Sequence, residues 1–157
     1  IENGATTIWE LWQGNVASPD MSSHNHVMML GDLIVWYNEH LAGIQSDPQH
    51  PGFKKLVMKP SLIEELDHVD ASYHSMHGLI ESHWRKNDST YQWNITIPGN
   101  TEAVVYIPAG SENDVMESNA QASSAEGIDF TRMENQRAVF KIGSGSYEFK
   151  SDIGSLE

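Results

Sequence analysis

A glutamate flanked by two tryptophans near the start of the chain is the group best suited to chemistry. Trp9, Glu10 and Trp12 follow a Gly-Ala-Thr-Thr-Ile run at positions 4–8. Indole rings stack on the apolar faces of sugar rings, and a carboxylate between them can accept a proton or stabilise a developing oxocarbenium ion. The same spacing also fits a helix start, with Thr7 as N-cap and Glu10 as the capping-box acid. On spacing alone, the capping box is the simpler interpretation.

A second polar group, Ser-Ser-His-Asn-His at positions 22–26, precedes an apolar stretch. His24 and His26 could bind a metal ion from an extended backbone, because imidazole is a common ligand. A catalytic zinc site needs three protein ligands, however, and no third ligand is evident nearby. A serine or asparagine of this group could instead cap the following helix while a histidine faces a polar cleft. We therefore predict neither a metal nor another cofactor.

The charge and composition of the chain exclude several classes of binding partner and of site. The 157 residues carry a net charge of −13, and such a surface repels phosphate backbones and anionic lipids. We therefore expect neither nucleic acid nor a membrane as a partner. No apolar run approaches the roughly 20 residues that span a bilayer. The absence of cysteine excludes a disulfide framework, a thiol nucleophile and a Cys-based zinc site.

The hydrophobic pattern divides the chain near Pro48. Residues 1–48 contain no Lys or Arg, and all nine basic residues follow Pro48. Apolar residues before it are spaced by three and four, which predicts a helix from Val27 to Ile44 that ends near Gly43. The residues of this stripe are Val27, Leu30, Ile34, Tyr37, Leu41 and Ile44. A second stripe of Met29, Leu33 and Trp36 predicts a helix buried on more than one side.

After Pro48 the period becomes two, which predicts a mostly β, antiparallel β-sandwich over residues 49–157. The clearest strand is 91–97, where Tyr91, Trp93, Ile95 and Ile97 alternate with polar residues. Further strands are expected at 55–59, 69–73, 79–85, 103–107, 128–133, 138–142 and 146–150. Gly143-Ser144-Gly145 predicts a tight hairpin between the last two strands, and 110–127 predicts a loop or weak strand.

Taken together, the motifs resemble the bacterial α-L-rhamnosidases of glycoside hydrolase family 78. The run at 4–12 is similar to the family's Gly-Ala-Thr-Thr-x-Trp-Glu-x-Trp signature, and residues 23–26 resemble its Ser-x-Asn-His segment. The resemblance continues almost to the end of the chain. It includes Leu-Ala-Gly-Ile at 41–44, Asp-Pro at 47–48, Pro-Gly-Phe-Lys-Lys at 51–55, Lys-Pro at 59–60, Ala-Ser-Tyr at 71–73, Gly78, Trp84, Ile-Pro-Gly-Asn-Thr at 97–101 and Gly-Ser-Gly at 143–145.

The resemblance implies a fold and a reaction. Residues 1–48 would be the last helical strip of an (α/α)6-barrel catalytic domain, and residues 49–157 the β-sandwich that follows it. The family removes terminal α-L-rhamnose from glycosides or polysaccharides with inversion at the anomeric carbon. Glu10 would be the general base, with His26, Trp9 and Trp12 lining the sugar pocket and the general acid outside this chain. Val27-Met28-Met29-Leu30-Gly31 stands where the family often has an aromatic-small-Gly run, which leaves the substrate preference open.

This interpretation carries further expectations and leaves alternatives. We expect the whole protein to be periplasmic or extracellular rather than cytoplasmic. The chain by itself should be inactive, because it lacks most of the barrel, and its helix should drive self-association or dock on the sheet. The alternatives are a non-catalytic carbohydrate-binding or structural β-sandwich module, and a metal-binding domain built on His24 and His26.

Overall fold

The computed structural model describes residues 8–9, 27–154 and 156, with backbone only over 27–29. The described part of the chain divides into two compact units, one ending at Tyr37 and one beginning at Asn38. The first unit contains helix α1 (Val27–Trp36). A π-helical turn, η2 (Tyr37–Leu41), follows it directly. Among the described residues, no helix is both long and apolar enough to cross a membrane.

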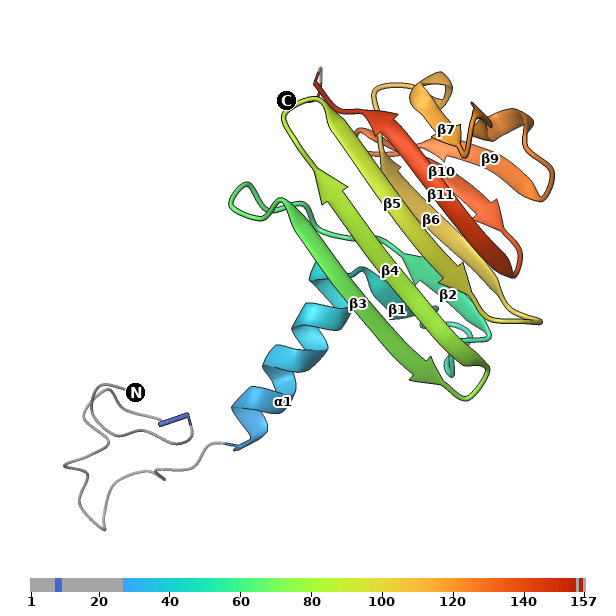
Figure 1. Ribbon diagram of the computed structural model, residues 1–157. Helices are drawn as coiled ribbons and strands as arrows, with labels where there is room; N and C mark the ends of the chain where they lie inside the picture. Colours follow the sequence, from blue (N-terminus) through green and yellow to red (C-terminus); the bar gives the residue numbers. More distant parts are fainter. Residues whose placement is uncertain (1–7, 10–26, 155, 157) are drawn as a thin grey trace, which may run out of the picture. The chain divides into compact units, whose positions relative to one another are not determined.

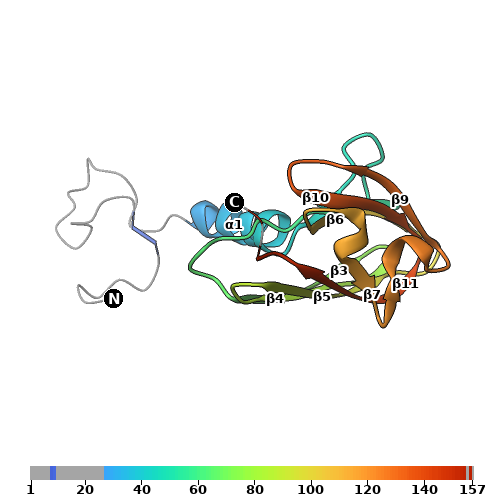
Figure 2. The ribbon, with the colours of Figure 1, turned by 90° about the horizontal axis from the view of Figure 1, so that it is seen from above.

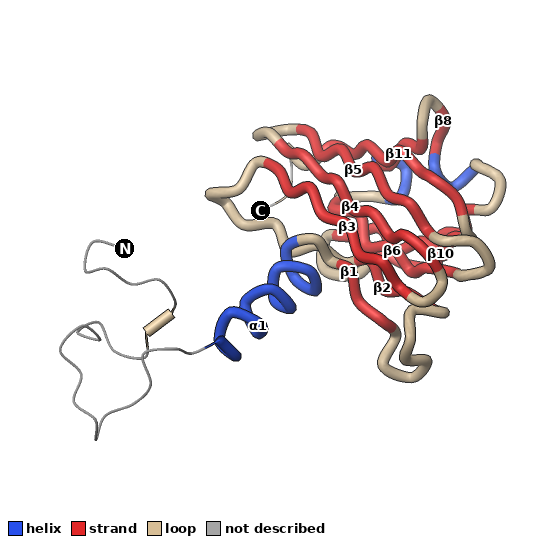
Figure 3. The backbone as a smooth tube through the Cα atoms, turned by 60° about the horizontal axis from the view of Figure 1, so that its bottom comes forward, coloured by secondary structure: helices blue, strands red, loops and turns tan. Residues whose placement is uncertain are grey.

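The second unit is a β-sandwich of two sheets, which Figure 1 shows from one face and Figure 2 along the layers. One sheet has five strands in the order β1-β2-β6-β10-β9, and the other has six in the order β3-β4-β5-β11-β7-β8. Strands dominate the described chain, as the red tube in Figure 3 makes visible. The strands are β1 (Ile44–Ser46), β2 (Lys55–Met58), β3 (His68–Ser75), β4 (Gly78–Lys86), β5 (Thr90–Ile97), β6 (Glu102–Pro108), β7 (Val115–Glu117), β8 (Ala120–Gln121), β9 (Ile128–Met133), β10 (Arg137–Ile142) and β11 (Gly145–Asp152). Two short 3₁₀ turns, η3 (Glu112–Asp114) and η4 (Ala122–Ser124), complete the described elements.

The core lies between the two sheets and is rich in aromatic residues. The alternation predicted for β5 is confirmed, because Tyr91, Trp93, Ile95 and Ile97 are all buried. The largest fully buried side chains also include Trp84, Phe140 and Phe149. Both sheets therefore turn one apolar face inward and one polar face outward, which is the pattern that a period of two predicts.

The predicted mostly β sandwich is confirmed, and its pairing is antiparallel except between β2 and β6, which run parallel. The predicted hairpin at Gly143–Gly145 is wrong, because β10 pairs with β6 and β9 while β11 pairs with β5 and β7. The glycine turn carries the chain from one sheet to the other. Gly145 has a φ of +152°, and the Tyr147 hydroxyl donates to the Gly143 carbonyl at 3.1 Å. A side chain is disfavoured at that backbone angle, so the glycine is used for a crossing between layers.

The predicted helix is shorter than its apolar stripe. Helical structure ends at Leu41, and Ile44 lies instead in β1, where it pairs with Met58. Gly43 marks the change with a φ of +73°, a value that ends helices and favours glycine. Burial of the helix on more than one side is not seen in this structure, since Leu33 and Trp36 are about 40% exposed (39% and 41%).

Candidate functional site

Most of the residues predicted to act on a substrate lie outside the described part of the chain. Glu10, Trp12 and His26 are among them, and so is His24, the other half of the metal alternative. Trp9 lies in irregular backbone and is half-buried. The roles of these residues therefore stay predictions. Within the described residues, no three His, Asp or Glu side chains come together in a group that could hold a metal ion.

The structure does describe the junction where the chain enters the sandwich. Five consecutive backbone carbonyls, from Glu39 to Gly43, accept hydrogen bonds from residues that come later in the chain. The donors are Gln45 Nε2 to Glu39 at 2.8 Å, Ser61 N to His40 at 2.7 Å, Trp84 Nε1 to Leu41 at 2.8 Å, Ser82 Oγ to Ala42 at 2.6 Å and Lys59 N to Gly43 at 2.9 Å. The last carbonyls of a helix have no partner within the helix, so they need such outside donors. We call residues 39–43 the junction.

Three fully buried side chains of the six-stranded sheet form the centre of this arrangement. Ser82 and Trp84 point inward from β4, and Trp93 lies opposite Trp84 on β5. The Trp93 indole donates to Ser82 Oγ at 2.9 Å, and that hydroxyl in turn donates to the Ala42 carbonyl. Every polar atom of these three side chains thus has a partner, as buried polar groups require.

Gly43 allows the junction to approach the sandwich closely. A Cβ atom on Gly43 would lie 2.2 Å from the Pro60 nitrogen and 2.5 Å from the Lys59 carbonyl carbon. Backbone atoms cannot move aside as the end of a flexible side chain can. Both the positive φ and this contact therefore require glycine here, within the Leu-Ala-Gly-Ile motif that the sequence singled out.

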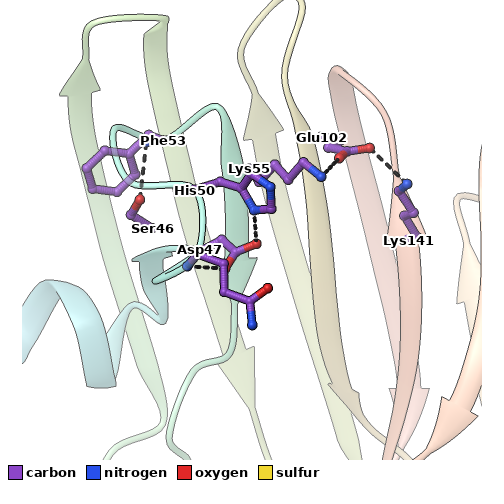
Figure 4. A network of polar contacts seen from close by, with 8 residues as sticks. Ser46, Asp47, His50, Phe53, Lys55, Glu102 and Lys141 are labelled. Carbon is purple, nitrogen blue, oxygen red and sulfur yellow. Dashed lines mark hydrogen bonds and ion pairs between the residues drawn. The ribbon is translucent and has the colours of Figure 1, made fainter.

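The loop after the junction is held by Asp47, as Figure 4 shows. Its carboxylate accepts from the backbone N–H of Gln49 at 2.9 Å and lies 2.9 Å from His50 Nδ1. The backbone N–H of Gln49, together with His50, keeps the pKa of Asp47 below its usual range. Ser46 Oγ accepts from the N–H of Phe53, whose ring packs 4.8 Å from that of Tyr73. The Asp-Pro and Pro-Gly-Phe motifs thus build one loop against the edge of the sandwich.

A neighbouring ion-pair group links three strands of the five-stranded sheet (Figure 4). Glu102 on β6 lies 2.9 Å from Lys141 on β10 and 3.2 Å from Lys55 on β2. These two cations, Lys141 more strongly, hold the pKa of Glu102 below its usual range. Such exposed pairs contribute little stability individually, and this group is a structural feature of the sheet surface.

The outer face of the six-stranded sheet bears a shallow polar groove of about 460 Å³. Residues that line it include Glu81, His83, Asn94, Thr96 and Ser146. The groups pair among themselves, with Thr96 Oγ1 3.3 Å from Ser146 Oγ and His83 within 4 Å of carboxylates of both Glu81 and Asp70. His68 and His74 of β3 and His83 of β4 thus lie on the solvated face of this sheet.

Comparison with known proteins connects both units to one family. The model of the bacterial alpha-L-rhamnosidase C-terminal domain matches residues 43–122, about half of the chain. The model of the bacterial alpha-L-rhamnosidase 6 hairpin glycosidase domain matches residues 1–41. The two matches meet at the junction, and the first of them contains the Gly43 and Trp84 positions described above.

Individual relatives agree with the family models. An alpha-L-rhamnosidase of Streptomyces avermitilis is 31% identical over 154 residues, which cover 95% of this chain and 14% of the relative. The crystal structure of a Streptomyces avermitilis alpha-L-rhamnosidase complexed with L-rhamnose superposes with a TM-score of 0.77 at 30% identity, over 95% of this chain and 14% of that one. The alpha-L-rhamnosidase from Dictyoglumus thermophilum gives a TM-score of 0.79 at 31% identity, over 96% of this chain and 16% of that one.

The chain therefore spans about a seventh of the length of the relatives it matches, 14–16% in the three cases above. The stretches on the two sides of residue 42 match two domains of the same group of glycosidases. This chain belongs to the bacterial α-L-rhamnosidase family.

Proposed function

We propose that this chain forms part of an inverting α-L-rhamnosidase that removes terminal α-L-rhamnose from glycosides or polysaccharides, with Glu10 as its general base. The observation that carries the proposal is the Trp9-Glu10-Leu11-Trp12 run, which lies inside the stretch matched by the glycosidase domain of the family. The solved Streptomyces relative is complexed with L-rhamnose, which supports rhamnose as the sugar.

The chemistry of each residue follows from the reaction. An inverting base must be ionised so that it can remove a proton from water on the face opposite the leaving group. The general acid then stands about 6.5–9.5 Å away, which leaves room for that water. Trp9 and Trp12 would stack on the sugar and exclude bulk solvent, while His26 would bind a sugar hydroxyl.

For the domain organisation, we propose a helical catalytic strip followed by the sandwich, with the boundary close to the junction. The sequence pattern placed the boundary at residues 48 and 49. Contacts within the described chain favour a point nearer Ala42, because Ala42 and Ile44 belong to the sandwich core and β1 pairs with β2. The sandwich would then be an accessory domain that contributes no catalytic group.

The decisive test is Glu10→Gln in the full-length protein, assayed with an aryl α-L-rhamnoside. The amide cannot accept the proton from water, so kcat should fall by at least about 100-fold. Glu126→Gln is the matched control, because it removes one negative charge from an exposed side chain outside the junction and should leave kcat unchanged. Retention of more than about a tenth of kcat by Glu10→Gln would reject the base assignment, since general base catalysis contributes on the order of 10²–10⁴-fold.

Two further arms separate a base from a structural carboxylate. Glu10→Gly should recover part of its activity with azide, because the small anion can occupy the space left by the carboxylate and attack the anomeric carbon. The 157-residue chain assayed alone should show no turnover, because the leaving oxygen would have no general acid. Turnover by this chain within about a thousandfold of the full-length protein would contradict the need for a separate acid. If no form of the protein hydrolyses rhamnosides, the alternative of a carbohydrate-binding or structural sandwich would be favoured.

A further inference from the structure

The junction joins the stretch matched by the glycosidase domain to the sandwich. Almost all of the hydrogen bonds to its backbone carbonyls come from the sandwich. Of the five carbonyls from Glu39 to Gly43, four accept from residues 59–84, and only Glu39 accepts from the nearby Gln45. A buried carbonyl without a partner destabilises the fold. The sandwich thus supplies what the end of the helical turn cannot supply for itself.

Two of these donors are side chains whose only polar group is used for the purpose. The indole N–H of Trp84 has a single proton, and it goes to Leu41 O at 2.8 Å. The Ser82 hydroxyl has a single proton, and it goes to Ala42 O at 2.6 Å. Both side chains are fully buried, so water cannot replace either bond.

We propose that Trp84 and Ser82 are positioning residues, through which the sandwich acts as the C-terminal cap of η2 and holds the junction in place. In the enzyme, this cap would restrain the chain where it leaves the segment that carries Glu10. That catalytic consequence rests on the proposed function, whereas the cap itself does not. The sandwich is then required for a precise active site although it touches no substrate.

Trp93 provides a matched control for Trp84. Both indoles are fully buried, they lie opposite each other on β4 and β5, and each donates one hydrogen bond. The Trp84 indole donates directly to the junction, whereas the Trp93 indole donates to Ser82, whose own hydroxyl proton still reaches the Ala42 carbonyl. Substitution by Phe removes the same atoms in both cases and therefore costs a similar core volume.

The experiment measures amide hydrogen exchange in this chain for Trp84→Phe and Trp93→Phe. Exchange of residues 38–46 is expressed relative to that of β5 and β11, which report the opening of the whole sandwich. Trp84→Phe should raise this ratio about tenfold, because the Leu41 carbonyl loses its donor. Trp93→Phe should raise the ratio much less, because the Ser82 hydroxyl keeps its bond to the Ala42 carbonyl. Equal ratios in the two variants would overturn the proposal, because the junction would then follow only the global stability.

Ser82→Ala keeps the test valid if Trp84→Phe does not fold. It removes the donor to Ala42 with a much smaller loss of volume, and it should also raise the ratio. An unchanged ratio in Ser82→Ala would overturn the cap.

In the full-length protein, Trp84→Phe should lower kcat about tenfold with KM nearly constant, while Trp93→Phe should not. Faster junction exchange without any change in kcat would leave the cap established but reject its role in catalysis, and activity independent of Glu10 would reject the proposed function alone.

Discussion

Helix α1 and the β-sandwich are both rich in large apolar residues, but the sandwich buries them and the helix leaves them exposed. In the sandwich, Trp84, Trp93 and Phe149 have no exposed surface. Along the helix, every side chain from Leu30 to Tyr37 is exposed, and Leu30 and Ile34 are about half exposed (48% and 51%). A helix with this much apolar surface is typical of one that packs inside a larger assembly of helices.

The difference shows that the sandwich buries its own apolar side chains, whereas the helix does not. Two sheets facing each other bury most of the large apolar side chains on their inner faces, which closes the core of the sandwich. A single helix cannot do this, since its stripes require partners on more than one side. This helix lies within residues 1–41, which match the 6 hairpin glycosidase domain of the family.

The most direct test of this comparison is the same Leu→Ala substitution made once in the sandwich and once in the helix. Leu56 in β2 is 1% exposed and Leu33 in α1 is 39% exposed. Leu56→Ala should lower the free energy of unfolding of the sandwich by about 2–5 kcal/mol, because it leaves a cavity in the core. Leu33→Ala should change it by less than about 0.5 kcal/mol. Urea denaturation followed by near-UV circular dichroism measures both. Equal losses would mean that the helix contributes to the core of the sandwich.

Acid should affect the sandwich through its paired carboxylates, with a smaller effect. The pKa values of Asp47, Glu102 and Glu134 are lowered, chiefly by the Gln49 N–H, Lys141 and Arg132 respectively. A carboxyl group whose folded pKa is depressed stabilises the fold above its unfolded pKa, about 3.9 for Asp and 4.3 for Glu. This stabilisation is lost as the pH falls through the lower, folded pKa.

Denaturation midpoints between pH 7 and pH 2.5 should therefore be flat at first and fall below about pH 4. Glu102→Gln should reduce the size of this fall, because it removes one of the titrating groups. The three carboxylates are partly exposed to solvent, with side-chain exposures of 27%, 34% and 32%, so the effect of each is modest. A midpoint that rises as the pH falls below about 4 would contradict the stabilising direction of these pairs.

The smallest effect is expected inside the core at Tyr91. Its hydroxyl is buried, and burial raises its pKa, but it has no hydrogen-bond partner among the described residues. Tyr91→Phe removes a polar atom whose burial is uncompensated, so stability should stay the same or rise by up to about 1 kcal/mol. A loss of more than about 1 kcal/mol in urea denaturation would show that the hydroxyl does have a stabilising partner.

Local patterns in the sequence predicted the strands well, because a half-buried strand must alternate. The inward residues of β5 were identified correctly from their period of two, and β10 and β9 lie close to their predicted bounds. The family could also be recognised from the order of short motifs, several of which have a visible structural reason. Gly43 is an example, because only glycine fits against Pro60.

The sequence predicted the candidate site less completely than it predicted the strands. Sequence reasoning identified Glu10, Trp9, Trp12 and His26 through the family resemblance, while spacing alone favoured a capping box. Sequence reasoning did not find the junction carbonyls or their donors Ser82 and Trp84. Each donor lies 40 or 43 residues from its acceptor along the chain. The one sequence signal for Trp84 is its place among the motifs that resemble the family.

The sequence by itself determined the class of fold, the approximate strands and the family, since alternation, glycine positions and short motifs are local properties. Only the tertiary structure decided how the strands are paired and where the helix gives way to the sandwich. Ile44 continues the helical spacing from Leu41, yet it lies in β1, because a spacing of three is equally compatible with a turn into a strand. Gly143 to Gly145 has the composition of a hairpin, yet it joins two sheets. In both cases the local backbone preference permits either outcome, and the burial of distant side chains between the two sheets selects one.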